Sequence, residues 1–453
     1  MRKTRILWLP VLASSLMAAN LDEIRAALVN RVEEGKRAVG IVAGTVDAAG
    51  RHVESYGRVS RETDQKPDGD TIFEIGSMTK VFTSLVLADM IERGEVKPDD
   101  PVARYLPENA GVPARGGKQI TLLDLSMQIS GLPRLPSNLA PADPLDPYAD
   151  YTGERLLDFL AGYKLQRDIG AKYEYSNLGV GLLGFALARR AGMSYEDMVR
   201  RRILEPLGMT STAITLSPEQ KKRLATGYNV GLEPAEPWNF DALAGAGAIR
   251  STANDLLKFL AANMGLIDTP LKAAMARMRS VHRETGLPGL EIMMGWHVWH
   301  KYGTDIVWHD GGTGGFRSWA GFDPARKTGV VVLCNTFLAM DDIGLHTLEN
   351  RWPIATFSPP KQRAEIALSP DAAARVSGDY QFAPGVLLTV TREGARMFAQ
   401  LTGQPPVEIY AESESEFFLK AVDAQLTFKL DRSGKVTAVV LHQNGINQTA
   451  IRK

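Results

Sequence analysis

The chain of 453 residues has one cysteine, no excess of charge of either sign and almost no long hydrophobic run. Cys334 is that cysteine, so no intrachain disulfide can form, and its apolar neighbours predict a buried structural thiol. Lys and Arg number 52, as do Asp and Glu, without a long run of one sign. This balance argues against a nucleic-acid or polyanionic partner, and a small neutral or zwitterionic substrate fits better.

The one apolar run near the start of the chain, residues 6–12, is too short to span a membrane. Basic residues precede it and small residues follow it, as in a cleavable signal peptide: Arg2, Lys3 and Arg5, then Ala18 and Ala19. We therefore expect a signal peptide over residues 1–19 and a periplasmic or secreted protein, without stable membrane insertion beyond the leader. An uncleaved, membrane-tethered form is the alternative.

The order of patterns along the chain predicts an α+β fold. Two strand-like segments lie within 39–57, helical spacing dominates 77–265, and strand patterns return over 296–333. A sheet interrupted by helices implies an α+β layer with an inserted helical lobe, here residues 20–354. Residues 355–370, which contain three prolines, read as a linker, and the short alternating segments in 371–453 predict a small antiparallel β-barrel or sandwich.

Ser77-Met78-Thr79-Lys80 stands where an extended stretch runs into an apolar helical pattern. A lysine one helical turn after a serine lies on the same face of the helix, so its amine comes beside the hydroxyl. A desolvated lysine can take the serine proton, which makes Ser77 a candidate nucleophile and Lys80 its base. Ser358-Pro359-Pro360-Lys361 has the same spacing, but two prolines there prevent a helix interior.

Tyr175-Ser176-Asn177 precedes a predicted helix and places a phenol and a carboxamide at its start. A phenol near a lysine can be held partly as phenolate, so Tyr175 could take the Ser77 proton and pass it to the leaving group. Asn177 could position Lys80 and bind a substrate carbonyl. Taken alone, this motif is better explained by a structural tyrosine and an Asn helix cap.

His309-Asp310-Gly311-Gly312 follows a strand-like segment. Gly311 and Gly312 at a strand edge would let a substrate backbone approach closely. The amides of Gly312 and Ser77 would then form an oxyanion hole, with His309 as a proton relay or a hydrogen-bond donor to the substrate. A structural histidine before a glycine turn is the simpler alternative.

Together and in this order, the three motifs resemble the serine β-lactamase and penicillin-binding-protein superfamily. The similarity spans about residues 22–350 and is greatest to the class C-related branch, which includes D-aminopeptidases, D-Ala-D-Ala carboxypeptidases and family VIII carboxylesterases. Further matching stretches are Asp99-Asp100-Pro101-Val102, Ser130-Gly131-Leu132-Pro133, Pro206-Leu207-Gly208-Met209, Ser251-Thr252-Ala253-Asn254-Asp255-Leu256 and Gly314-Gly315-Phe316.

This resemblance implies an antiparallel sheet flanked by helices, plus an all-helical lobe. It implies Ser77 as the nucleophile, Lys80 and Tyr175 as the bases, Asn177 as a positioning residue and His309 at the third motif. Residues after Pro370 resemble the lipocalin-like domain attached to some of these hydrolases, which can shape the active-site entrance or mediate homo-oligomer contacts.

Two departures from the family bear on the substrate. His309 stands where true β-lactamases have lysine, so a permanent positive charge for a substrate carboxylate is missing, although Arg317 or Arg134 could replace it. The stretch 126–132 is richer in apolar residues than its family counterpart, which predicts a more apolar cleft lining.

Three functions remain open at the level of the sequence. An acyl-enzyme hydrolase of β-lactams or D-amino-acid peptides leads, a carboxylesterase of small acyl esters is the close alternative, and a penicillin- or cell-wall-binding protein without turnover is the third. None requires a metal or an organic cofactor. A zinc enzyme is disfavoured, because His297 and His300 are three residues apart in a strand-like segment and would point to opposite faces.

Overall fold

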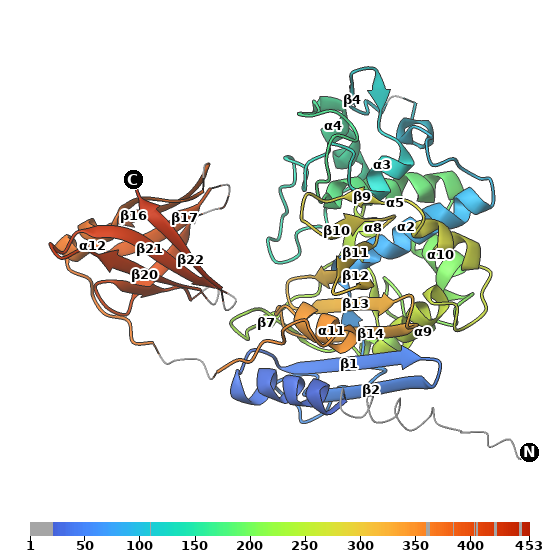
Figure 1. Ribbon diagram of the computed structural model, residues 1–453. Coiled ribbons are helices and arrows are strands. Elements are labelled where there is room, and N and C mark those ends of the chain that lie inside the picture. The colour runs from blue at the N-terminus through green and yellow to red at the C-terminus, as the bar shows by residue number, and fades with distance from the viewer. Residues whose placement is uncertain are drawn as a thin grey trace, which may run out of the picture. The chain divides into compact units, whose positions relative to one another are not determined.

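The computed structural model describes residues 21–108, 110–358, 363–383, 385–402, 404, 406–420, 424–443 and 446–453. The chain divides into two compact units, Met1–Phe357 and Ser358–Lys453, which are described separately (Figure 1). The predicted leader, residues 1–19, lies outside the described residues, as do 359–362 of the predicted linker and most of the second serine–lysine match. No helix within the described ranges is long and apolar enough to cross a membrane.

The first unit is built on an eight-stranded antiparallel sheet with the order β2-β1-β14-β13-β12-β11-β10-β9 (Figure 1). Its strands are β1 (Gly40–Asp47), β2 (Gly50–Gly57), β9 (Arg283–Glu284), β10 (Leu290–Ile292), β11 (His297–Lys301), β12 (Thr304–Gly312), β13 (Arg317–Asp323) and β14 (Thr328–Cys334). The first hairpin pairs with the last strand, with Ile41 opposite Cys334. The sheet therefore joins strands that the helical region separates in the chain.

Both faces of this sheet are covered, and the alternation of side chains along β14 shows how. Val331 and Leu333 belong to the large core shared with the helical region, whereas Val330, Val332 and Cys334 belong to a second core under α11 (Asp341–Leu348). Successive side chains of a strand point to opposite faces, so a strand buried on both sides reads as a continuous apolar run. The prediction of a buried Cys334 is confirmed.

The helical region lies between β2 and β9 in the chain and carries short two-stranded ladders. Its helices are α2 (Thr79–Glu92), α3 (Leu122–Ser126), α4 (Gly153–Gly162), α5 (Asn177–Ala191), α6 (Tyr195–Val199), α7 (Pro218–Lys221), α8 (Ala244–Gly247), α9 (Ala253–Asn263) and α10 (Lys272–Met278). Short turns of other helix types in this region are η2 (Gly76–Met78), η3 (Val102–Tyr105) and η4 (Arg200–Leu204), and a further one, η1 (Asn30–Glu34), precedes β1. The short ladder strands are β3 (Phe73–Glu74), β4 (Ala114–Arg115), β5 (Lys118–Gln119), β6 (Gly227–Tyr228), β7 (Pro234–Ala235) and β8 (Arg250–Ser251).

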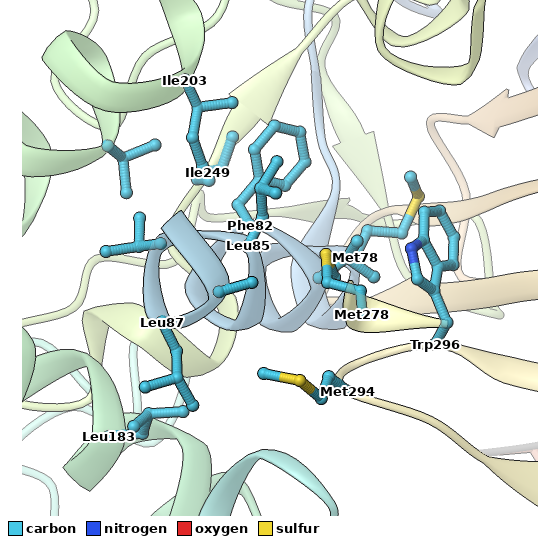
Figure 2. Close-up of a cluster of buried hydrophobic side chains, with 14 of the residues drawn as sticks. Met78, Phe82, Leu85, Leu87, Leu183, Ile203, Ile249, Met278, Met294 and Trp296 are labelled. Carbon is cyan, nitrogen blue, oxygen red and sulfur yellow. The ribbon is translucent and has the colours of Figure 1, made fainter. Parts of the chain in front are cut away.

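Helix α2 passes through the middle of the large core. All residues from Thr79 to Met90 are buried, so the helix has no solvent-facing stripe and is enclosed on every side. Figure 2 shows the side chains of Phe82 and Leu85 on one side of this helix and that of Leu87 on the other. A helix held in this way gives its first turn, and the residues just before it, a fixed position.

The second unit is a closed barrel of eight antiparallel strands preceded by the helix α12 (Pro370–Val376) (Figure 1). Its strands are β15 (Gly378–Ala383), β16 (Val386–Glu393), β17 (Arg396–Leu401), β18 (Val407–Ala411), β19 (Glu416–Phe418), β20 (Ala424–Leu430), β21 (Val436–Gln443) and β22 (Ile446–Arg452). The α+β fold with a small C-terminal antiparallel barrel is confirmed. The alternating patterns between 387 and 441 predicted six of these strands, whereas β15 and β22 were missed.

Candidate active site

The turn that carries Ser77 rests directly on the backbone of β12. A Cβ atom on Gly311 would lie 1.9 Å from the Ile75 carbonyl oxygen and 2.9 Å from the Ser77 nitrogen, and one on Gly76 would lie 2.7 Å from the Gly312 nitrogen. Gly76 also has φ +49°, which favours glycine. Both glycines are therefore needed for this approach, which brings the amides of Ser77 and Gly312 to one edge, as an oxyanion hole requires.

Lys80 is completely buried, and its Nζ lies 2.9 Å from Ser77 Oγ. The same nitrogen donates to the Ala246 carbonyl oxygen at 2.7 Å. Burial lowers the pKa of Lys80 well below its usual value, and the nearby Arg134 charge lowers it further. A neutral amine at this position can accept the proton of the Ser77 hydroxyl, so the geometry and the electrostatics both suit a general base.

Tyr175 is half-buried and shares a hydrogen bond with the Ser77 side chain. Its ring centroid lies 4.9 Å from Lys80 Nζ. Burial raises the pKa of Tyr175 far above that of a free phenol, an effect that outweighs the Ser77 hydrogen bond. The expectation of a partial phenolate is therefore wrong for the free enzyme: the phenol keeps its proton, and Lys80 is the group suited to act first as base.

The loop that presents Tyr175 is fixed by residues on either side of it. Ser176 caps α5, because its Oγ accepts from the Gly179 amide at 2.8 Å, so Asn177 is not the cap. The Gln128 side chain, which is buried, accepts from the Ser176 amide at 2.7 Å. Gln128 was not predicted as a positioning residue from the sequence. The signal that could have revealed it is that glutamine at this position departs from the family pattern.

The hydrogen bonds described for Lys80 do not include one to Asn177. Asn177 Nδ2 donates to the Tyr148 hydroxyl at 3.3 Å, and its Oδ1 is buried without a described partner. A buried carbonyl oxygen without a partner can accept a hydrogen bond from a ligand. The structure thus suits the expected contact to substrate, whereas Lys80 is held by Ala246 rather than by Asn177.

His309 is buried at the end of β12, with its ring centroid 6.3 Å from that of Tyr175. Burial lowers its pKa to about 4, so the ring is neutral near pH 7. Its Nδ1 lies 2.5 Å from the Asp310 carbonyl oxygen, and a carbonyl can only accept, which leaves Nε2 as the unprotonated nitrogen. In the free enzyme His309 is thus an acceptor at Nε2 rather than a cation.

The two histidines considered for zinc lie apart in different surroundings. His297 is buried, packs 5.3 Å from the His309 ring between centroids, and its Nε2 lies 2.9 Å from the Tyr173 hydroxyl. His300 is exposed at the sheet edge. These two residues do not form a common site.

Arg317 is already paired. Its Nη2 lies 3.0 Å from Asp310 Oδ2 and 3.4 Å from Asp341 Oδ2. Arg134, in contrast, is exposed, stacks with its Cζ 5.0 Å from the Tyr175 ring centroid, and forms no ion pair with a described residue. The permanent cation facing the site is therefore Arg134.

The predicted apolar lining from the stretch 126–132 is not formed. Met127 and Ile129 are 1 % and 6 % exposed and belong to the large hydrophobic core. Their apolar side chains replace polar ones at positions that pack inward, so they change the core rather than the surface that a substrate would meet.

A comparison with protein families decides the identity of the first unit. The family described as "Beta-lactamase" matches residues 24–349. The chain belongs to the β-lactamase family. The second unit matches a domain of unknown function, DUF3471, over residues 362–451.

Relatives in this family cover most of the chain. The D-alanyl-D-alanine-carboxypeptidase/endopeptidase AmpH of Escherichia coli K12 is 29 % identical over 346 residues, which are 70 % of this chain and 89 % of AmpH. Penicillin-binding protein 4* of Bacillus subtilis is 26 % identical over 419 residues, which are 86 % of this chain and 90 % of that protein. The second similarity extends into the barrel unit.

Solved structures agree with this assignment. A class C β-lactamase from Rhodobacter sphaeroides superposes with a TM-score of 0.64 at 26 % identity, covering 73 % of this chain and 99 % of its own. A β-lactamase/D-alanine carboxypeptidase from Yersinia pestis gives 0.63 at 27 %, covering 71 % and 93 %. The resemblance seen in the sequence is confirmed, and the chain is a serine hydrolase of the β-lactamase-related type.

Proposed function

We propose that this chain hydrolyses amide bonds of β-lactams or D-amino-acid cell-wall peptides through an acyl-enzyme on Ser77. The observation that carries the proposal is the buried Lys80 amine, which lies 2.9 Å from Ser77 Oγ and whose pKa is held far below its usual value. Relatives named as β-lactamases and as a D-alanyl-D-alanine carboxypeptidase support the bond type.

In the proposed reaction Lys80 takes the Ser77 proton as Oγ attacks the carbonyl carbon. The amides of Ser77 and Gly312 stabilise the oxyanion, and the Asn177 carboxamide binds the substrate beside it. The protonated phenol of Tyr175 donates its proton to the leaving nitrogen, and Lys80 then returns to Tyr175 the proton that it took from Ser77. Water then cleaves the ester, releases the acid and restores the serine hydroxyl.

We assign substrate carboxylate recognition to Arg134 and not to Arg317. Arg317 would have to leave two carboxylates, Asp310 and Asp341, to bind a third. Arg134 already lies against Tyr175 with its guanidinium unpaired among the described residues. A charged hydrogen bond from arginine is worth about 1.5–3 kcal/mol, so Arg134→Gln should lower kcat/KM for an acid substrate about 10–150-fold and leave that for its methyl ester little changed.

A carboxylesterase is the second candidate, and the neutral His309 favours it. An ester of a small acid has no carboxylate that needs a cation at the third motif, and its alcohol leaves more easily than an amine. The same Ser77, Lys80 and Tyr175 would serve both reactions. A third possibility is a penicillin- or cell-wall-binding protein in which Ser77 is acylated in the same way but the acyl-enzyme is not hydrolysed.

One experiment separates the three functions. Mature protein and Ser77→Ala are incubated with nitrocefin, p-nitrophenyl butyrate and a D-alanyl p-nitroanilide. Lactam or D-peptide turnover that Ser77→Ala abolishes supports the proposal, dominant ester turnover makes the protein a carboxylesterase, and a stable acyl adduct detected by mass spectrometry without turnover makes it a binding protein. Turnover that survives in Ser77→Ala refutes the mechanism.

The proposal includes export to the periplasm or the medium and a small-molecule substrate, with homo-oligomerisation left to measurement. The basic and apolar residues of 1–19 support export, because they have the layout of a signal peptide. Sequencing the amino terminus of protein recovered from the periplasmic fraction tests this. A product that begins at Met1 in the cytoplasm contradicts it.

A further inference from the structure

Two exposed histidines and a glutamate meet at the edge of the large sheet, away from the serine. His282 follows α10, Glu291 lies in β10 and His300 in β11, and one ligand atom from each lies within 4.8 Å of the others. Glu291 Oε2 is the common point: it lies 2.8 Å from His282 Nδ1 and 3.2 Å from His300 Nε2. Three segments of chain thus converge on one carboxylate.

The second nitrogen of each ring already has an acceptor. His282 Nε2 lies 2.9 Å from the Arg279 carbonyl oxygen, and His300 Nδ1 lies 2.7 Å from Asp305 Oδ1. A carbonyl and a carboxylate accept hydrogen bonds, so in the neutral rings the protons sit on these nitrogens. His282 Nδ1 and His300 Nε2 then both direct lone pairs at the Glu291 oxygen, an arrangement that a cation between them would stabilise.

We propose that His282 Nδ1, His300 Nε2 and the Glu291 carboxylate bind a divalent transition-metal ion, with zinc as the metal that fits best. Ligands of a tetrahedral zinc with bonds of about 2.0–2.1 Å lie about 3.3 Å apart. The two separations from Glu291 Oε2, 2.8 and 3.2 Å, are close to this value, and the two histidine nitrogens lie within 4.8 Å of each other. Imidazole ligands favour zinc, copper or nickel over magnesium or calcium. Because the three side chains are partly exposed, water can complete the coordination.

The outer contacts have the form expected around such a metal. Metal-bound histidines usually donate their other N–H to a carbonyl or carboxylate, which fixes the ring and raises its basicity. Here the Arg279 carbonyl and Asp305 take these two roles. The ion would join the segment after α10 to β10 and β11, so it would stabilise this edge of the sheet, and it would act independently of Ser77.

Isothermal titration of tag-free, chelator-treated full-length protein with zinc tests the proposal, with thermal unfolding recorded at each zinc concentration. Wild-type protein should bind one zinc ion and its Tm should rise with zinc. His282→Ala and His300→Ala should each weaken binding at least tenfold and remove the rise in Tm. Asp305→Asn should weaken binding about 10–100-fold, since it changes only the outer contact.

The matched control is His52, an exposed histidine whose Nε2 lies 2.9 Å from Glu54 but which has no second histidine beside it. His52→Ala should bind zinc as the wild type does, and so should Ser77→Ala, which keeps this test separate from that of the proposed function. Zinc affinity that is unchanged in His282→Ala and His300→Ala, or no binding by the wild type at micromolar zinc, would overturn the proposal. If the zinc-free variants unfold at the same Tm as zinc-free wild type, the substitutions have not disrupted the fold.

Discussion

A single methyl group at Gly311 should abolish most of the activity without unfolding the protein. The Cβ of Gly311→Ala would lie 1.9 Å from the Ile75 carbonyl oxygen and 2.9 Å from the Ser77 nitrogen, both of them backbone atoms. Neither can rotate away as a side chain can, so β12 and the turn must separate by more than 1 Å to restore ordinary contact. The Ser77 and Gly312 amides would then no longer point to one oxyanion.

The size of the effect follows from the loss of a donor to the oxyanion. Removal of one such donor typically lowers kcat about 10²–10³-fold, or about 2.7–4 kcal/mol. Overpacking in a tight interior costs about 1–3 kcal/mol of stability, which a unit with a core of this size should survive. We therefore expect kcat to fall at least 10²-fold, with a modest decrease in Tm and little change in KM.

Steady-state kinetics on whichever substrate the wild type turns over fastest, together with thermal unfolding, measure both quantities. Gly162→Ala is the control, because a Cβ there meets nothing within 4 Å and the residue only ends α4. Ser318→Ala is a milder second variant, since it deletes the 2.8 Å hydrogen bond from Ser318 Oγ to the Ile75 carbonyl that clamps the same turn. Wild-type kcat in a folded Gly311→Ala would refute the assignment of the oxyanion hole.

Two further predictions follow from the pKa shifts. The pKa of Lys80 is depressed and the neutral amine is the proposed base, so kcat/KM should rise with pH as Lys80 loses its proton. Lys80→Arg stays charged, so its kcat/KM should be at least 10³-fold lower than that of the wild type at every pH. A pH–rate profile in which Lys80→Arg is within tenfold of the wild type would contradict this. His309 has a pKa of about 4 in the folded protein and about 6.5 unfolded, so the unfolded chain binds the extra proton between these values and the free energy of unfolding should fall as pH drops from 6.5 to 4, by up to about 3 kcal/mol from this residue. Urea unfolding of wild type and His309→Asn at pH 7 and 4.5 measures it, and an equal loss in both proteins would show that His309 does not contribute.

The parts of the fold that the sequence predicted are those with a local pattern. The two strands expected within 39–57 appear as β1 and β2, and the helical spacing over 77–265 as helices such as α2, α5 and α9, because both patterns are visible within a few residues. The serine–lysine pair was also local, since four residues of helix bring the two side chains together. Recognition of the family then placed Tyr175 and His309 in the same site, which no spacing could have done.

What the sequence could not predict depends on residues that are distant in the chain. Gln128 supports the Tyr175 loop through Ser176, which is 48 residues away in the chain. His282 and His300 meet at Glu291 only because β10 and β11 pair in a particular register. The ionisation of Tyr175 was also misjudged. A nearby lysine suggested a phenolate, but burial raises the pKa of the phenol, and burial also lowers the pKa of Lys80.

The choice between Arg317 and Arg134 shows how strand geometry determines which cation the site can use. In β12 and β13, His309 lies opposite Ala320, which belongs to the core on the helical side, whereas Asp310 lies opposite Trp319, which belongs to the core under α11. Adjacent residues of a strand point to opposite faces, so Asp310 and its partner Arg317 are directed away from the face that His309 shares with Tyr175. Arg317 therefore does not place a positive charge on the face of His309, although the two are close in sequence. This geometry supports the proposed role of Arg134 in binding a substrate carboxylate.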